Sequence, residues 1–124
     1  MALETPALKQ TPRSPLASCY VKPEEVPWEP MPGVSGIEMK VLVQDRETGL
    51  FTGLFRLEPG AVVPDHIHTD IGQIYVLEGT FADEDGVAHA GDFIWRPKGN
   101  RHEAHSPDGC VILGFFLTPN QFLK

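Results

Sequence analysis

The sequence predicts one all-β domain folded as a sandwich or a barrel. The chain has 124 residues, enough for a single domain with its own core. It contains 12 prolines and 12 glycines, and few stretches repeat apolar residues with the period of a helix. Short runs rich in β-branched and aromatic residues instead alternate with turn signals, which is the pattern of many short strands.

Two proline-rich segments precede the predicted sheet. Residues 1–18 hold three prolines among Ser, Thr and Lys, and predict an arm without a core of its own. The folded domain is therefore expected over residues 19–124. Residues 23–32 are also rich in proline and contain Trp28. We expect them to form an extended segment that lies across the outside of a sheet.

Alternation of apolar and polar residues marks the strand candidates. From Ile37 to Gln44 the period of two is broken only at Leu42. Asp45–Gly49 has the composition of a turn, and Asp83–Gly86 that of a hairpin turn. The expected strands are residues 37–44, 50–58, the run through His66 and His68, 73–81, 93–96, the neighbourhood of Ala104, and 110–117.

Two glycine-framed segments carry the candidate metal ligands. The first runs from Gly60 to His68 and places two histidines two residues apart in a strand-like stretch. Alternate strand residues point to one face, so His66 and His68 can present two imidazoles to one point. The second runs from Gly91 to His102 and supplies a third histidine just after a Pro-x-Gly turn. Neutral imidazole suits Zn, Fe, Ni and Cu, so the pattern predicts a divalent metal site.

These segments resemble the two motifs of the cupin superfamily. The first motif, G-x5-H-x-H-x3/4-E-x6-G, is matched by Gly60, His66, His68 and Gly79. The second, G-x5-P-x-G-x2-H-x3-N, is matched by Gly91, Pro97, Gly99 and His102, with Ser106 in place of Asn. The resemblance spans roughly residues 34–118. It is closest to the branch that contains the cupin domains of zinc-binding anti-sigma factors and the acetylacetone- and dihydroxyacetophenone-cleaving dioxygenases. It implies a double-stranded β-helix, a jelly-roll barrel with the metal inside.

One position departs from that branch. The family's fourth ligand is a Glu four residues after the second His, and Gly72 stands there. The resemblance therefore implies three neutral ligands, His66, His68 and His102, completed by Gln73 or by water. The metal would be Fe2+ or Zn2+, with Mn2+ or Ni2+ as alternatives.

Strand parity leaves two registers open beside the predicted metal site. If Gln73 faces inward, Tyr75 and Leu77 do too. If position 72 faces inward, Ile74 and Val76 do instead. Both sets are apolar enough for a core, so the pattern does not separate them.

Gln73, Tyr75 and Arg96 are the candidate catalytic residues. Gln73 would ligate the metal or donate to a bound molecule, and Tyr75 is a possible general base. The other possible bases are Glu78, Glu103 and His105. Arg96, like Arg101, offers a planar pair of donors to an anionic group of a substrate, or else pairs with the excess acidic residues.

The sequence gives weaker indications that several other residues belong to the site. Asp70 continues the parity of His66 and His68 but lies in a turn-like stretch, and we expect His105 at the surface. The aromatic strand residues are expected mostly in the core, with one or two along an apolar pocket around the metal. They are Trp95, Phe115 and Phe116.

A divalent ion held by three neutral imidazoles keeps nearly its full charge and has open coordination positions. Such a centre favours a bidentate, anionic oxygen chelator, such as an enolised diketone or hydroxyketone. By resemblance, we expect a metal-dependent dioxygenase that cleaves or oxidises a small molecule of this kind. The alternatives are a non-catalytic sensory or ligand-binding cupin and a metal-dependent isomerase or lyase.

Composition narrows the partners. The formal net charge of −7 argues against nucleic acid and anionic membranes. No long apolar run or signal-peptide pattern occurs, so a cytoplasmic protein is expected. The two cysteines, Cys19 and Cys110, are expected to be reduced. We further expect a homodimer, in which residues 20–32 with Trp28 cover sheet edges; the alternative is that this segment folds back on its own barrel.

Overall fold

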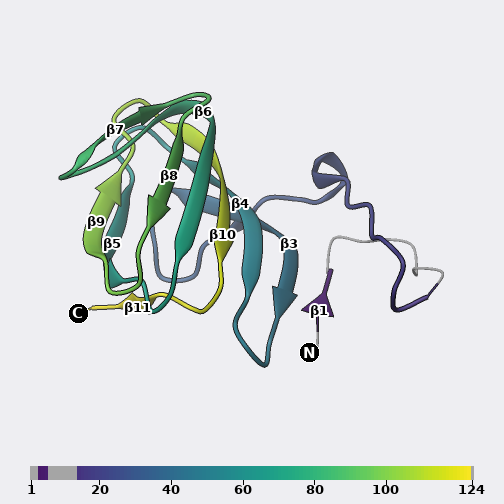
Figure 1. The fold of residues 1–124 in the computed structure, drawn as a ribbon. Coiled ribbons are helices and arrows are strands. Elements are labelled where there is room, and N and C mark those ends of the chain that lie inside the picture. The colour runs from purple at the N-terminus through teal and green to yellow at the C-terminus, as the bar shows by residue number, and fades with distance from the viewer. Residues whose placement is uncertain (1–2, 6–13, 124) are drawn as a thin grey trace.

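Antiparallel strands make up nearly all the regular structure in residues 3–5 and 14–123, the parts that the computed structural model describes (Figure 1). The strands are β1 Leu3–Glu4, β2 Glu29–Pro30, β3 Ile37–Asp45, β4 Phe51–Leu57, β5 Val62–Ile67, β6 Gly72–Asp83, β7 Gly86–His89, β8 Phe93–Arg96, β9 Arg101–His105, β10 Cys110–Phe116 and β11 Gln121–Phe122. Within those ranges the helical element is one 3-10 turn, η1 Pro23–Glu25, and no helix is long and apolar enough to cross a membrane. The predicted all-β class is confirmed.

The long strand β6 joins two parts of one curled sheet. Its first half pairs with β10 and β8, and its second half pairs with β7 and, at Ala82, with β9. The order along the sheet is β1-β3-β4-β10-β6-β9-β5-β11. Figure 1 shows β5 and β9 curling round to face β4 and β10 across the interior. Side chains on the concave face therefore point into one shared space.

Alternation along the strands selects which side chains enter that space. In β6, Gly72, Ile74 and Val76 are buried, whereas Tyr75 and Leu77 are exposed. The core is built from such inward residues: Ile37, Leu57, Ile74, Val76, Phe81, Ala88, Ala104, Cys110 and Ile112. The break in period at Leu42 is a register shift between β3 and β4, which lies between Val41 and Val43.

The proline-rich segment before β3 lies against its own sheet. Strand β2 pairs with β3, with Glu29 opposite Met39. The ring of Trp28 lies 4.7 Å from Lys40 Nζ and 4.4 Å from the Arg56 guanidinium carbon. This is the arrangement expected if the segment folds back on its own barrel. Of the predicted arm, residues 1–2 and 6–13 lie outside the described part of the chain.

Both cysteines are free thiols, as predicted. Cys110 is buried in the core and Cys19 is exposed. Ser106, which replaces the Asn of the second motif, is fully buried and donates its hydroxyl to the carbonyl oxygen of Thr80 at 2.6 Å. This hydrogen bond ties the end of β9, the strand Arg101–His105 that contains His102, to β6, so the substitution is accommodated by a backbone contact.

Candidate metal centre

The backbone brings the three histidines together from two neighbouring strands. His66 in β5 is the direct register partner of His102 in β9. His68 follows β5, and the turn of the second motif holds its backbone: His68 N donates to Asn100 O at 2.8 Å, and Gly99 N donates to His68 O at 2.7 Å. The Pro-x-Gly turn therefore fixes both the third histidine and the second.

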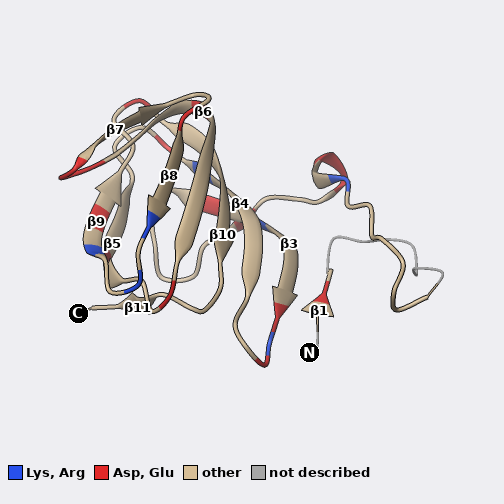
Figure 2. Ribbon diagram, viewed as in Figure 1, with Lys and Arg blue, Asp and Glu red and all other residues tan. Residues whose placement is uncertain are grey.

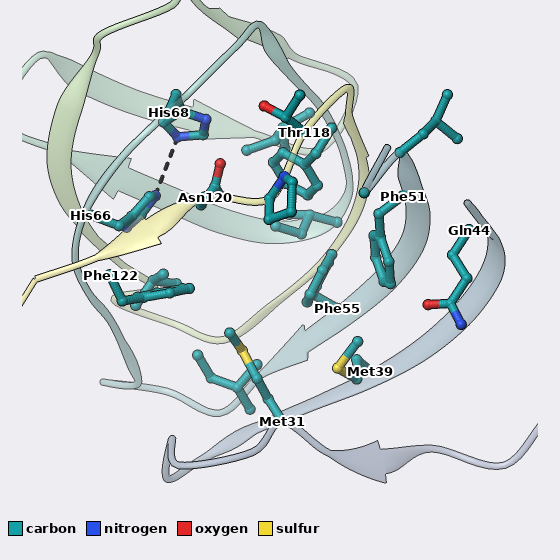
Figure 3. Close-up of a pocket in the computed structure, with 18 of the residues that line it drawn as sticks. Met31, Met39, Gln44, Phe51, Phe55, His66, His68, Thr118, Asn120 and Phe122 are labelled. Carbon is teal, nitrogen blue, oxygen red and sulfur yellow. Dashed lines mark hydrogen bonds between the residues drawn. The ribbon is translucent and has the colours of Figure 1, made fainter. Parts of the chain in front are cut away.

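The three imidazole rings meet at their Nε2 atoms. These atoms are 3.2 Å apart between His66 and His68, and 2.9 Å apart between His68 and His102 (Figure 3 shows the first pair). All three side chains are at most 4 % exposed. Nitrogens about 2.1 Å from a common tetrahedral ion are roughly 3.4 Å apart, so the observed spacing is close to that of a ligand set.

Protonation and tautomer also suit a cation. Burial, together with the nearby charges of His66 and Arg96, lowers the pKa of His68 to about 4. Burial, together with the charges of Arg96 and the other two histidines, lowers the pKa of His102 to about 3. Burial likewise lowers the pKa of His66. The Nδ1 of His66 lies 2.7 Å from the carbonyl oxygen of Pro64, so it donates there and leaves a lone pair on Nε2. Lone pairs that converge in a buried space repel one another unless a cation lies between them.

The carboxylate of Asp83 lies beside His102, near the Nδ1 atom and not the Nε2 atom that faces the other histidines. Asp83 Oδ1 accepts hydrogen bonds from Asp85 N and Gly86 N in the β6–β7 turn, which fixes the carboxylate. Its Oδ2 accepts from Arg96 Nη1 and lies 3.7 Å from His102 Nδ1. Burial raises the pKa of Asp83, but the hydrogen bonds from Arg96 and Asp85 N and the positive charge of Arg96 together outweigh it, so the pKa is lowered and the carboxyl stays ionised. The charge favours the tautomer of His102 that leaves Nε2 free for a metal.

Gly72 settles the strand parity beside the site. A Cβ built on Gly72 would lie 2.6 Å from His68 Nδ1 and 2.8 Å from His68 Cε1. Position 72 therefore faces the histidines, and Gln73 and Tyr75 lie on the opposite face of β6. There Gln73 is opposite Trp95 of β8 and Phe115 of β10. The structure thus brings together His66, His68 and His102, and it places Gln73 and Tyr75 away from them.

The remaining sequence candidates are not among the clustered ligand groups, although Arg96 lies close enough to lower the pKa of each of the three histidines. Arg96 is buried in an ion pair with Asp83, and Arg101 is exposed and pairs with Asp65. Asp70 accepts from Ile71 N and is not part of the clustered groups. The other candidate bases, Glu78, Glu103 and His105, are exposed.

A cavity of about 450 Å³ opens from the histidines into the barrel. Phe116 lines it, as expected for one of the three aromatic strand residues. The prediction that most of the three lie in the core was wrong, because Trp95 and Phe115 are on the outward parity of their strands and are exposed. Motif spacing missed two groups of residues. Thr118, Asn120 and Phe122 line the cavity from the C-terminal segment, and Asp83 stands behind His102 in a turn that otherwise reads as an ordinary hairpin.

Comparisons with known proteins agree with this geometry. The family model described as the ChrR cupin-like domain matches residues 16–119. A putative acetylacetone dioxygenase from Methylibium petroleiphilum PM1 has a similar structure, with a TM-score of 0.82 and 25% identity over 92% of this chain and 86% of that chain. No curated protein matches the sequence.

Two further similar structures belong to proteins of different kinds, a dioxygenase and an anti-sigma protein. An acetylacetone dioxygenase from Acinetobacter johnsonii has a TM-score of 0.81 and 23% identity over 94% of this chain and 85% of that chain. The Rhodobacter sphaeroides anti-sigma ChrR, solved with SigE, has a TM-score of 0.64 and 26% identity over 77% of this chain and 50% of that chain. These likenesses confirm the predicted jelly-roll fold, and they include both an enzyme and a regulatory protein.

Proposed function

The chain belongs to the ChrR cupin-like domain family, and on that premise we propose that it is a metal-dependent, oxygenase-type enzyme. Its substrate would be a small diketone- or hydroxyketone-like molecule. The observation that carries this proposal is the set of three buried, neutral imidazoles beside a glycine where the related branch has a carboxylate ligand. The similarity to two acetylacetone dioxygenase structures supports it.

Each part of the site has a role in this proposal. His66, His68 and His102 would hold a divalent ion, most simply Fe2+ for oxygen chemistry and Zn2+ for a binding role. When bound, such an ion would supply positive charge for an enolate oxygen pair and a place for dioxygen to react. Because the three ligands are neutral, that charge is not reduced by the protein, which favours an anionic chelator over a neutral one.

The surroundings support an acidic substrate. Tyr75, Glu78, Glu103 and His105, the candidate general bases, are exposed and do not line the cavity. A diketone loses a proton readily, so it needs little help from a base. An isomerase or lyase would need a base beside the substrate carbon. This placement therefore weighs against the isomerase or lyase alternative.

Oxygen uptake tests the proposal. Oxidative cleavage of a β-diketone by dioxygen balances when both oxygen atoms enter the products, a carboxylic acid and a 2-oxoaldehyde. We expect protein loaded with ferrous iron to consume one O2 per diketone, and His102→Ala to abolish the reaction. If no β-diketone or hydroxyaryl ketone supports uptake while the metal remains bound, the protein is a metal-dependent binding domain instead.

A further inference from the structure

The cavity is much larger than the metal centre. Its volume of about 450 Å³ lies within the roughly 300–1,000 Å³ of pockets that hold small organic ligands. Acetylacetone would fill only the part next to the histidines. The rest of the space must suit whatever is attached to the chelating group.

That remaining space has an apolar wall, which we call the arm chamber and define as Met31, Met39, Phe51, Phe55 and Phe116. Figure 3 shows Phe55 between the histidines and Met39, with Phe51 further toward Gln44. Flexible thioethers and aromatic faces pack well against uncharged carbon groups.

Aromatic rings connect the chamber to the metal centre without a gap. The Phe116 ring centroid lies 6.1 Å from that of His68, 6.2 Å from that of Phe55 and 6.5 Å from that of Phe51. Phe51 and Phe55 are 5.9 Å apart. A group attached to a metal-bound chelate would therefore meet an aromatic surface from its first atoms onward.

The charged side chains of the wall are already engaged. Among the described lining residues other than histidine, Asp45 and Arg46 carry charge. Asp45 is buried and its Oδ1 accepts from Glu47 N at 2.9 Å, while Arg46 is largely exposed and pairs with Glu4 at 2.9 Å. Figure 2 shows acidic and basic residues at the β3–β4 turn, away from β5 and β9. Arg96 is buried against Asp83. Among the described residues around the cavity, a second anionic group on the ligand would therefore meet no cation that is not already paired.

From this distribution we infer the substrate class more narrowly: a 1,3-dicarbonyl-type chelator with one uncharged alkyl or aryl arm, which lies in the arm chamber. The site would discriminate against chelators that carry a second carboxylate or phosphate. The inference rests on the proposed function, because it presumes a chelate at the three histidines. It adds the size and the polarity of the group beyond the chelate.

Calorimetry on zinc-loaded protein tests the inference without any turnover. The probes are acetylacetone, benzoylacetone, which replaces one methyl by a phenyl arm, and acetopyruvate, which replaces it by a carboxylate. We expect benzoylacetone to bind about tenfold more tightly than acetylacetone, since five added atoms at about 0.3 kcal/mol each give about one decade. Acetopyruvate should bind at least about tenfold more weakly than benzoylacetone. Zinc retained after dialysis distinguishes binding from removal of the metal.

Replacing Phe51 tests whether the phenyl group of benzoylacetone lies in the arm chamber, and replacing Phe115 provides the matched control. Phe51→Ala should remove most of the preference for benzoylacetone and leave acetylacetone binding within about twofold of wild type. Phe115→Ala removes the same side chain from the outer face of the sheet and should change neither affinity. Phe51→Leu, which keeps more volume, gives the same comparison if the alanine variant does not fold.

The results distinguish failure of the apolar-arm inference from failure of the proposed function. If acetylacetone binds as tightly as benzoylacetone, or acetopyruvate binds best, the apolar-arm inference is overturned and the proposed function stands. The same holds if the benzoylacetone preference survives in Phe51→Ala. If none of the three probes binds to zinc-loaded protein, the proposed function falls together with the inference.

Discussion

Replacing Gly72 by alanine should weaken metal binding, although alanine is a small residue and position 72 does not require a positive φ. The added Cβ would lie 2.6 Å from His68 Nδ1, whereas ordinary contacts are about 3.5–4.0 Å. The His68 ring would have to retreat by about 1 Å, and metal sites tolerate ligand displacements of only about 0.2 Å.

The magnitude follows from the packing. His68 is 1 % exposed, so its ring has little free space to enter, and overpacking of this kind costs about 1–3 kcal/mol. If the metal-bound form carries that cost, zinc affinity falls roughly 5- to 150-fold. Competition titration of zinc against a chelator of known affinity measures the change.

Gly86→Ala is the matched control. Gly86 also lacks a positive φ, and a Cβ at that position would meet no atom within 4 Å. Its zinc affinity should equal that of wild type. If Gly72→Ala binds zinc as tightly as Gly86→Ala, then position 72 does not press on His68, and the assigned orientation of β6 beside the metal centre is wrong.

Three other experiments test the role of Asp83, the protonation of the buried histidines and the oligomeric state. Asp83→Asn removes the charge behind His102 and should weaken zinc binding about 10- to 100-fold; unchanged affinity would leave Asp83 with a purely structural role in its turn. Metal-free protein should lose stability as the pH falls from about 6.5 towards 4, because His68 and His102 bind protons more readily when unfolded. At pH 5 the loss is about 2 kcal/mol for each, and urea denaturation that shows no loss between pH 7.5 and 5 would contradict neutral burial. Finally, we propose that the homodimer forms through the exposed outer face that holds Trp95 and Phe115, since residues 28–30 lie against their own sheet: light scattering should give twice the chain mass, and Trp95→Lys should reduce it, whereas a monomeric wild type at micromolar concentration would contradict the proposal.

Motif spacing was sufficient to find the histidine cluster because strand geometry leaves few alternatives. The i, i+2 spacing favours the same side of an extended segment for His66 and His68, and the glycine-framed turn before His102 holds the backbone of His68 and returns the chain beside both. The break at Leu42 was likewise visible as a break in period. The longer strands, such as β3, β4 and β10, were predicted to within one residue at each end, whereas β7 and the two-residue strands β1, β2 and β11 were not predicted.

Other features were hidden because they depend on register and on contacts distant in sequence. The choice between Gln73 and position 72 as the inward residue depends on the pairing of β6 with β8 and β10, and both registers offered apolar partners. Arg96 could equally have faced a substrate. Its burial against Asp83 comes from the two-sided pairing of β6, which no local pattern encodes. The C-terminal segment with Asn120 carries no motif at all.

The zinc content of purified protein tests the central claim most directly. Protein stripped with a chelator, reloaded with zinc and dialysed should retain about one ion per chain by elemental analysis. His102→Ala, treated in the same way, should retain almost none, because two imidazoles from one strand are too few ligands for a stable site. Equal zinc content in the two proteins, or none in the wild type, would contradict a metal centre at His66, His68 and His102.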